Sequence, residues 1–134
     1  MNELFPISQH KPPRVLLIED DDQTRRLLRE VLEAQGYEIL ESVNGKEGLS
    51  MFQAQPVDLV ICDLVMPEKG GISTIQELGK LAPTLKIIAM SGYSRALGEN
   101  ALAYTKRLGT LATLAKPFAL SEMIAMVNKA IPAQ

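Results

Sequence analysis

Short apolar runs alternate with stretches of helical periodicity along this chain of 134 residues. Runs that are short and continuously apolar are typical of strands covered on both faces. The predicted strands are residues 15–18, 37–40, 57–63, 85–90 and 111–115. Strands that alternate with helices form a parallel sheet with helices on both faces. The pattern therefore predicts an α/β fold built on a five-stranded parallel sheet.

Helices are predicted in the intervals between these strands. Asp21 or Asp22 is expected to cap the first helix and Asn44 the second, while Gly36 is expected to end the first. The later helices are predicted at residues 72–81, over a longer stretch that ends near residue 108, and around residues 123–127. Right-handed crossovers leave few topologies. We predict a flavodoxin-like doubly wound (βα)5 three-layer sandwich with the strand order 2-1-3-4-5.

Length and composition limit the class of protein. A chain of this length forms one domain, which we expect at residues 14–131, between a flexible leader at 1–13 and a short tail at 132–134. The net charge of -2 leaves no basic surplus, so we expect no nucleic-acid partner. Cys62 is the one cysteine, which excludes an intramolecular disulfide and a thiolate metal cluster. Without a membrane-spanning apolar run or a signal peptide, we expect no membrane association and a cytoplasmic location.

Polar residues follow four of the five predicted strands at the point where each strand ends. Glu19 and Asp20 follow the first strand, Asp63 ends the third, Ser91 follows the fourth and Lys116 follows the fifth. These side chains are therefore expected at the carboxyl edge of the sheet, where the ligands of such sheets bind. Each has an ordinary explanation when taken alone, such as a helix cap, a turn residue or a solvated lysine. Their convergence on one edge makes coincidence the poorer explanation.

Clustered carboxylates repel one another and require a hard cation. Oxygen ligands without nearby histidine or cysteine favour Mg²⁺, which also binds phosphate. Lys116 is suited to pair with a phosphate oxygen and Ser91 to donate a hydrogen bond to another. The set therefore favours phosphoryl transfer, and Asp63, at the end of the central strand, is the predicted carboxylate acceptor.

Four motifs in order resemble the response regulator receiver family of two-component signalling. They are residues 15–21 (VLLIEDD), 58–67 (DLVICDLVMP) with Gly71, 87–92 (IIAMSG) and 116–118 (KPF). The resemblance spans roughly residues 14–131. It implies that Glu19 and Asp20 are the acid pair that holds Mg²⁺, and that Asp63 is both phosphoacceptor and metal ligand. The backbone carbonyl of Val65 is implied as a further ligand.

The resemblance also implies which residues respond to phosphorylation. Ser91 matches the switch hydroxyl, Lys116 the lysine that pairs with the phosphoryl group, and Pro117 the proline that follows a cis bond. Thr113 stands where the family often has an aromatic switch residue, which is a departure from the pattern.

The resemblance implies a stand-alone response regulator, a signalling domain rather than an enzyme. A sensor histidine kinase or a histidine phosphotransfer protein is the expected phosphodonor, and the downstream protein target is not indicated. A homodimer through the last two helices, the one at residues 97–108 and the final one, is compatible with this role.

Two alternatives remain open at the level of sequence. Residues 20–24 (DDDQT) fit the D-x-D-x-T nucleophile loop of haloacid dehalogenase-like phosphatases, with Asp20 as nucleophile and Asp22 as general acid. The second alternative is a pseudo-receiver that only binds partners, although the acid pair, the acceptor and the lysine are all present.

Overall fold

The computed structural model describes residues 12–64, 70–91 and 109–131. These residues form a five-stranded parallel sheet in the order β2-β1-β3-β4-β5. The strands are β1 (Arg14–Ile18), β2 (Glu38–Ser42), β3 (Leu59–Asp63), β4 (Lys86–Ser91) and β5 (Ala112–Ala115). The predicted fold class and strand order are confirmed.

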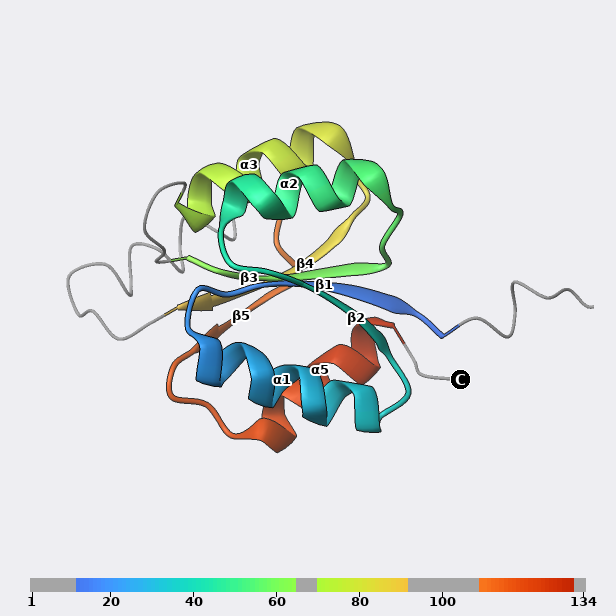
Figure 1. The fold of residues 1–134 in the computed structure, drawn as a ribbon, viewed down its shortest axis with the longest axis vertical. Coiled ribbons are helices and arrows are strands. Elements are labelled where there is room, and N and C mark those ends of the chain that lie inside the picture. Colours follow the sequence, from blue (N-terminus) through green and yellow to red (C-terminus); the bar gives the residue numbers. More distant parts are fainter. Residues whose placement is uncertain (1–11, 65–69, 92–108, 132–134) are drawn as a thin grey trace, which may run out of the picture.

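Helices cover both faces of this sheet and complete a three-layer sandwich (Figure 1). They are α1 (Asp22–Ala34), α2 (Gly45–Ala54), α3 (Gly71–Leu81) and α5 (Leu120–Ala130). α2 and α3 lie on one face, and α1 and α5 lie on the other. The helix predicted to end near residue 108, most of the predicted leader and the predicted tail lie outside the described residues. None of the helices in the described ranges is long and apolar enough to cross a membrane.

Alternation along the buried strands explains the two covered faces. In β1, Val15 and Leu17 belong to the core that α1 and α5 complete, whereas Leu16 and Ile18 belong to the core that α2 and α3 complete. All four side chains are fully buried. Because the strand is buried on both faces, its residues form a continuous apolar run. The polar residues at its ends are therefore easily recognised in the sequence.

The predicted helix boundaries rest on side-chain caps that the structure contains. Asp21 is the N-cap of α1, and its carboxylate accepts the Thr24 backbone N–H at 2.8 Å. Asn44 caps α2 in the same way through the Glu47 N–H. Gly36 follows α1 with a φ of 101°, a conformation that favours glycine.

Two predicted strand boundaries are wrong by two residues, and the others agree with the structure within one residue. β2 continues to Ser42, because it pairs with β1 as far as Ile18 and the Glu19 N–H donates to the Ser42 carbonyl at 3.1 Å. The apolar pattern fades before that point, so the prediction stopped at residue 40. β3 begins at Leu59 instead of residue 57, where Asp58 exchanges hydrogen bonds with the backbone of Arg14.

Candidate phosphoacceptor and metal site

The carboxyl ends of the parallel strands bring the predicted site residues to one edge of the sheet. Asp63 is the last residue of β3 and Ser91 the last of β4, while Glu19 and Lys116 come directly after β1 and β5. Asp20 follows Glu19 in the connection to α1. The predicted convergence of these residues is therefore present in the fold.

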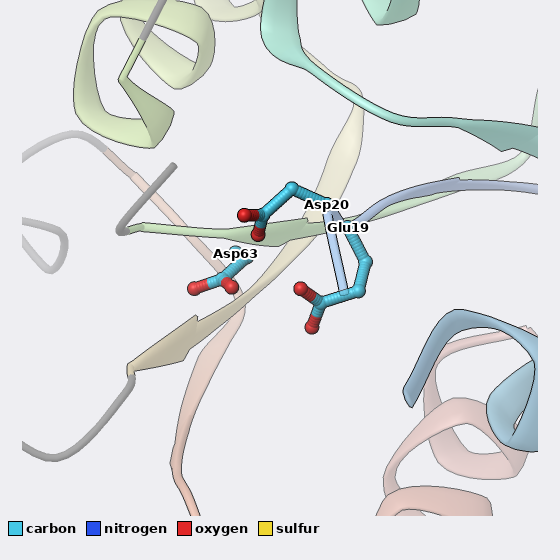
Figure 2. A group of neighbouring side chains, drawn as sticks. All are labelled: Glu19, Asp20 and Asp63. Carbon is cyan, nitrogen blue, oxygen red and sulfur yellow. The ribbon is translucent and has the colours of Figure 1, made fainter. Parts of the chain in front are cut away.

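Three of these side chains form a carboxylate cluster. Glu19, Asp20 and Asp63 each offer one oxygen, and these oxygens lie within 4.8 Å of one another. Figure 2 shows the three carboxylates turned toward a shared space beyond the ends of β1 and β3. Glu19 is fully buried and Asp63 is 4% exposed, whereas Asp20 is exposed. The cluster therefore has two buried carboxylates at its base and one at its solvent side.

The ammonium of Lys116 reaches two members of the cluster. It donates a hydrogen bond to Glu19 and another, of 3.0 Å, to Asp63. Lys116 follows β5, the last strand along the chain. Its ion pairs therefore join the carboxyl ends of β1, β3 and β5. The ammonium offsets part of the negative charge of the cluster, and an excess of carboxylate remains.

Burial and charge change the ionisation of these groups in opposite ways. The pKa of Glu19 is raised to about 7, because burial and the neighbouring Asp63 raise it more than the hydrogen bond from Lys116 lowers it. Burial lowers the pKa of Lys116, but its contacts with Glu19 and Asp63 outweigh burial and leave that pKa raised. Lys116 therefore stays charged. Ionising both buried carboxylates, Glu19 and Asp63, costs free energy unless a cation lies beside them.

The donor set suits Mg²⁺. The cluster consists of carboxylate oxygens, which are the ligands that hard divalent cations prefer. A divalent cation in the space that the carboxylates share would relieve the repulsion between them. The neighbouring ammonium of Lys116 is placed to contact an anion bound to the same cation. The residues thus fit a site where a phosphoryl group and Mg²⁺ bind together.

Comparison with known proteins identifies the family. A model of the response regulator receiver domain matches residues 15–128. The chain is 33% identical over 118 residues to the chemotaxis protein CheY of Thermotoga maritima, which covers 87% of this chain and 95% of CheY. It is 34% identical over 116 residues to the receiver protein CpdR of Brucella abortus, with coverages of 87% and 94%. This chain belongs to the response regulator receiver family.

A solved structure agrees with that assignment. The response regulator protein TrrA from Thermotoga maritima, in complex with Mg²⁺-BeF, is 31% identical to this chain with a TM-score of 0.77. The match covers 89% of this chain and 99% of TrrA. Receiver domains are phosphoacceptors rather than classical enzymes, and they accept phosphoryl groups from histidine kinases. The acidic cluster is typical of their phosphoacceptor site.

The structure describes three of the remaining predicted site residues: Ser91, Thr113 and Pro117. Ser91 is 5% exposed, and its carbonyl accepts the Lys116 backbone N–H at 2.7 Å. Thr113 is half-buried in β5, opposite Ala89 of β4. The bond between Lys116 and Pro117 is cis, as the resemblance implied. Val65 lies outside the described residues, so its carbonyl stays a prediction.

The phosphatase alternative loses support at Asp22. The carboxylate of Asp22 accepts a hydrogen bond from Arg25 at 2.5 Å, and its side chain is 73% exposed in the first turn of α1. It does not belong to the group of carboxylates that gathers around Asp63. An acid that is ion-paired outside the cluster is poorly placed to protonate a leaving group there.

Two residues that support the site were not predicted from the sequence. Gly71 was interpreted only as part of a motif, yet a Cβ at this position would lie 2.1 Å from the Asp63 carbonyl oxygen. Its N–H donates to the Leu64 carbonyl at 3.2 Å. Arg25 has no role predicted from the sequence, yet it donates to the Glu19 carbonyl. Arginine at this position carries no sequence signal that separates it from Arg26 and Arg29.

Proposed function

We propose that this chain is a stand-alone receiver of a two-component phosphorelay, in which Asp63 accepts a phosphoryl group from a phosphohistidine. One observation carries the proposal: the buried carboxylate of Asp63 lies among the acidic cluster and accepts a hydrogen bond from Lys116. A sensor histidine kinase or a histidine phosphotransfer protein is the donor. The stand-alone role is supported by CheY and CpdR, because the chain spans nearly the whole of both.

The proposed transfer exchanges one bond to phosphorus for another. A carboxylate oxygen of Asp63 attacks the phosphorus, and a P–O bond forms as the P–N bond to the donor imidazole breaks. The electron pair of the P–N bond stays on the imidazole nitrogen. Lys116 pairs with a phosphoryl oxygen and so stabilises the negative charge that reaches the site.

Metal binding is part of the same proposal. Glu19, Asp20, Asp63 and the backbone carbonyl of Val65 are the proposed ligands of Mg²⁺. The ion supplies neutralisation of the phosphoryl oxygens, which provides much of the catalysis in phosphoryl transfer. TrrA, which was solved in complex with Mg²⁺-BeF, supports this assignment because it is 31% identical to this chain.

Signalling is proposed to follow from a change of the protein-binding face after phosphorylation. Ser91, at the end of β4, is the proposed switch hydroxyl that turns toward the aspartyl phosphate. Since Thr113 replaces the frequent aromatic residue, we infer that the change depends on Ser91 and not on an aromatic rotamer. Receiver domains are typically cytoplasmic, and we infer the same location here.

We further infer a homodimer through the helix predicted at residues 97–108 and α5. Sedimentation velocity with Mg²⁺, in the presence and absence of beryllium fluoride, tests this assembly. A sedimentation coefficient that rises with protein concentration, with or without beryllium fluoride, would support the dimer, and an unchanged monomer at the highest concentration would oppose it.

Intact-mass spectrometry after incubation with acetyl phosphate and Mg²⁺ tests the proposed function. We expect one phosphoryl adduct in the unmodified protein, and none in the Asp63→Asn variant or in the presence of EDTA. Asp58→Asn is the matched control, because Asp58 precedes the same strand at its opposite end. Absence of an adduct, while another receiver is labelled in parallel, would favour a domain that only binds partners. An adduct on Asp20 would instead favour the phosphatase chemistry.

A further inference from the structure

The guanidinium of Arg25 joins three segments next to the carboxylate cluster. Its Nη1 donates to the backbone carbonyl of Glu19 at 2.8 Å, its Nε to the Glu41 carboxylate at 3.2 Å and its Nη2 to Asp22 at 2.5 Å. These acceptors belong to the end of β1, to β2 and to the first turn of α1. The Arg25 side chain is only 14% exposed, and its contacts with Glu19 and Glu41 are partly buried, whereas its partner Asp22 is 73% exposed.

The Glu19 carbonyl belongs to the peptide group that connects Glu19 to Asp20, the two acids of the proposed metal site. The direction of this peptide group sets where both side chains leave the backbone. On one side, the Glu19 N–H is held by the Ser42 carbonyl at 3.1 Å. On the other side, the Asp21 N–H donates to the Glu19 carboxylate at 3.1 Å. The described contact that holds the carbonyl itself comes from Arg25.

We propose that Arg25 is a positioning residue for the metal site, which holds the peptide group between Glu19 and Asp20 in the orientation that Mg²⁺ requires. This inference rests on the proposed function, since it concerns the same carboxylate cluster. Arg25 does not touch the cluster through its own charge, because its guanidinium points to the backbone oxygen of Glu19 and to acids outside the cluster. It therefore acts through Glu19 and Asp20.

Arg29 provides a matched control in the same helix. It also binds Glu41, and its second partner is Glu33 at 3.1 Å. Within the described residues, the hydrogen bonds of Arg29 go to Glu33 and Glu41 and not to the connection between β1 and α1, and its side chain is 43% exposed. Replacing either arginine with methionine removes one positive charge and one partner of Glu41, but only the Arg25 variant releases the Glu19 carbonyl.

Charge alone predicts the opposite result from positioning. A positive charge near a cation site repels the cation, so its removal should strengthen Mg²⁺ binding. Loss of a group that orients a ligand should weaken binding instead. Residues that hydrogen-bond to metal ligands typically contribute about 10- to 100-fold in metal affinity. The sign of the change therefore separates the two roles.

Isothermal titration of MgCl2 into the unphosphorylated protein at fixed ionic strength measures this sign without any phosphodonor. We expect the dissociation constant of Arg25→Met to rise about tenfold, and that of Arg29→Met to stay within about twofold of the unmodified protein. Arg25→Lys, which keeps the charge and the aliphatic stem, is expected to weaken binding in the same direction. A lysine cannot reach three separated acceptors with one ammonium.

Thermal melts without Mg²⁺ show how much of each variant is folded, and the dissociation constants are compared for the folded protein. Unchanged or tighter Mg²⁺ binding in both Arg25 variants would overturn the positioning role. Equal weakening in Arg25→Met and Arg29→Met would overturn it as well, because it would trace the effect to Glu41. If the unmodified protein did not bind Mg²⁺, the proposed function would fail together with this inference.

Discussion

The two edges of the sheet carry charged residues of the same kinds but arrange them differently. At the amino edge, Arg14 donates to the Glu38 carboxylate at 3.2 Å and to the Pro56 carbonyl at 3.0 Å. Asp58 accepts the Arg14 backbone N–H at 2.8 Å, and Lys86 donates to the Ala130 carbonyl at 2.6 Å. Each of these contacts ties a strand to its neighbour or to the end of α5.

At the carboxyl edge, the charges are crowded and unequal. Three carboxylates lie close together, two of them are buried, and Lys116 binds both buried ones. Burying like charges side by side costs stability, so this arrangement is difficult to explain as a set of contacts that hold neighbouring strands together. The difference teaches that pairing alone does not mark a functional edge, whereas an unbalanced and buried cluster does.

The lysines of the two edges should differ most. Lys116→Met removes the ammonium that contacts Asp63, so we expect the initial rate of labelling by acetyl phosphate with Mg²⁺ to fall about 100-fold. Lys86→Met removes a contact with the Ala130 carbonyl and should leave that rate unchanged. Mass spectrometry over a time course measures both rates, and equal rates in the two variants would remove the distinction between the edges.

Gly71→Ala should destabilise the carboxyl edge strongly. The added Cβ would lie 2.1 Å from the Asp63 carbonyl oxygen and 2.5 Å from the Leu64 Cα, and these backbone atoms cannot move without displacing β3. We expect the free energy of unfolding to fall by about 3 kcal/mol, as for a severe overpacking. Urea denaturation measures this change.

Gly48→Ala is the control for that substitution. Its Cβ would lie 2.6 Å from the Ile18 Cδ1, 2.9 Å from the Ile18 Cγ1 and 3.0 Å from the Ser42 Oγ, which are side-chain atoms and not backbone atoms. We expect a cost of about 1 kcal/mol or less, since alanine also favours the helix. If Gly71→Ala cost no more than Gly48→Ala, the close approach of α3 to the acceptor strand would not constrain the site.

Asp58→Asn should affect the stability of the amino edge without affecting labelling. The substitution weakens the charge-assisted hydrogen bond from the Arg14 backbone N–H, so we expect a loss of about 1 kcal/mol in urea denaturation. The phosphoryl adduct should form at the normal rate at saturating Mg²⁺. Slower labelling in this variant would mean that the two ends of β3 are coupled.

Glu38→Gln should have the smallest effect. The ion pair with Arg14 is partly solvated, with 25% and 43% of the two side chains exposed. Exposed pairs of this kind contribute little, so we expect a change of about 0.5 kcal/mol or less in the free energy of unfolding. A loss of several times that size would show that the amino edge depends on this pair more than its exposure suggests.

Much of the site could be predicted because topology converts sequence position into spatial position. Once Glu19, Asp63 and Lys116 are assigned to the ends of parallel strands, the fold must bring them to one edge. The caps at Asp21 and Asn44 were equally accessible, because they depend on neighbours three residues away. Local chemistry and strand order were therefore readable from the chain.

The supporting contacts could not be predicted in this way. Ser42 extends β2 because of its pairing with β1, and the polar residue conceals this in the sequence. Gly71 is required by the close approach of α3 to β3, and Arg25 matters because its guanidinium reaches back to Glu19. Each of these roles depends on a distance between elements that residue patterns do not contain.

The contrast between the edges is tested most directly by a titration of the ¹⁵N-labelled protein with MgCl2 followed by NMR. We predict that the amide signals of Glu19, Asp20, Asp63 and Lys116 shift with one shared dissociation constant, while those of Arg14, Asp58 and Lys86 stay in place. Acetyl phosphate should then shift the first group again, and only when Mg²⁺ is present. Shifts of similar size at both edges, or none at the carboxyl edge, would contradict the assignment of the acidic cluster as the Mg²⁺-dependent phosphoacceptor site.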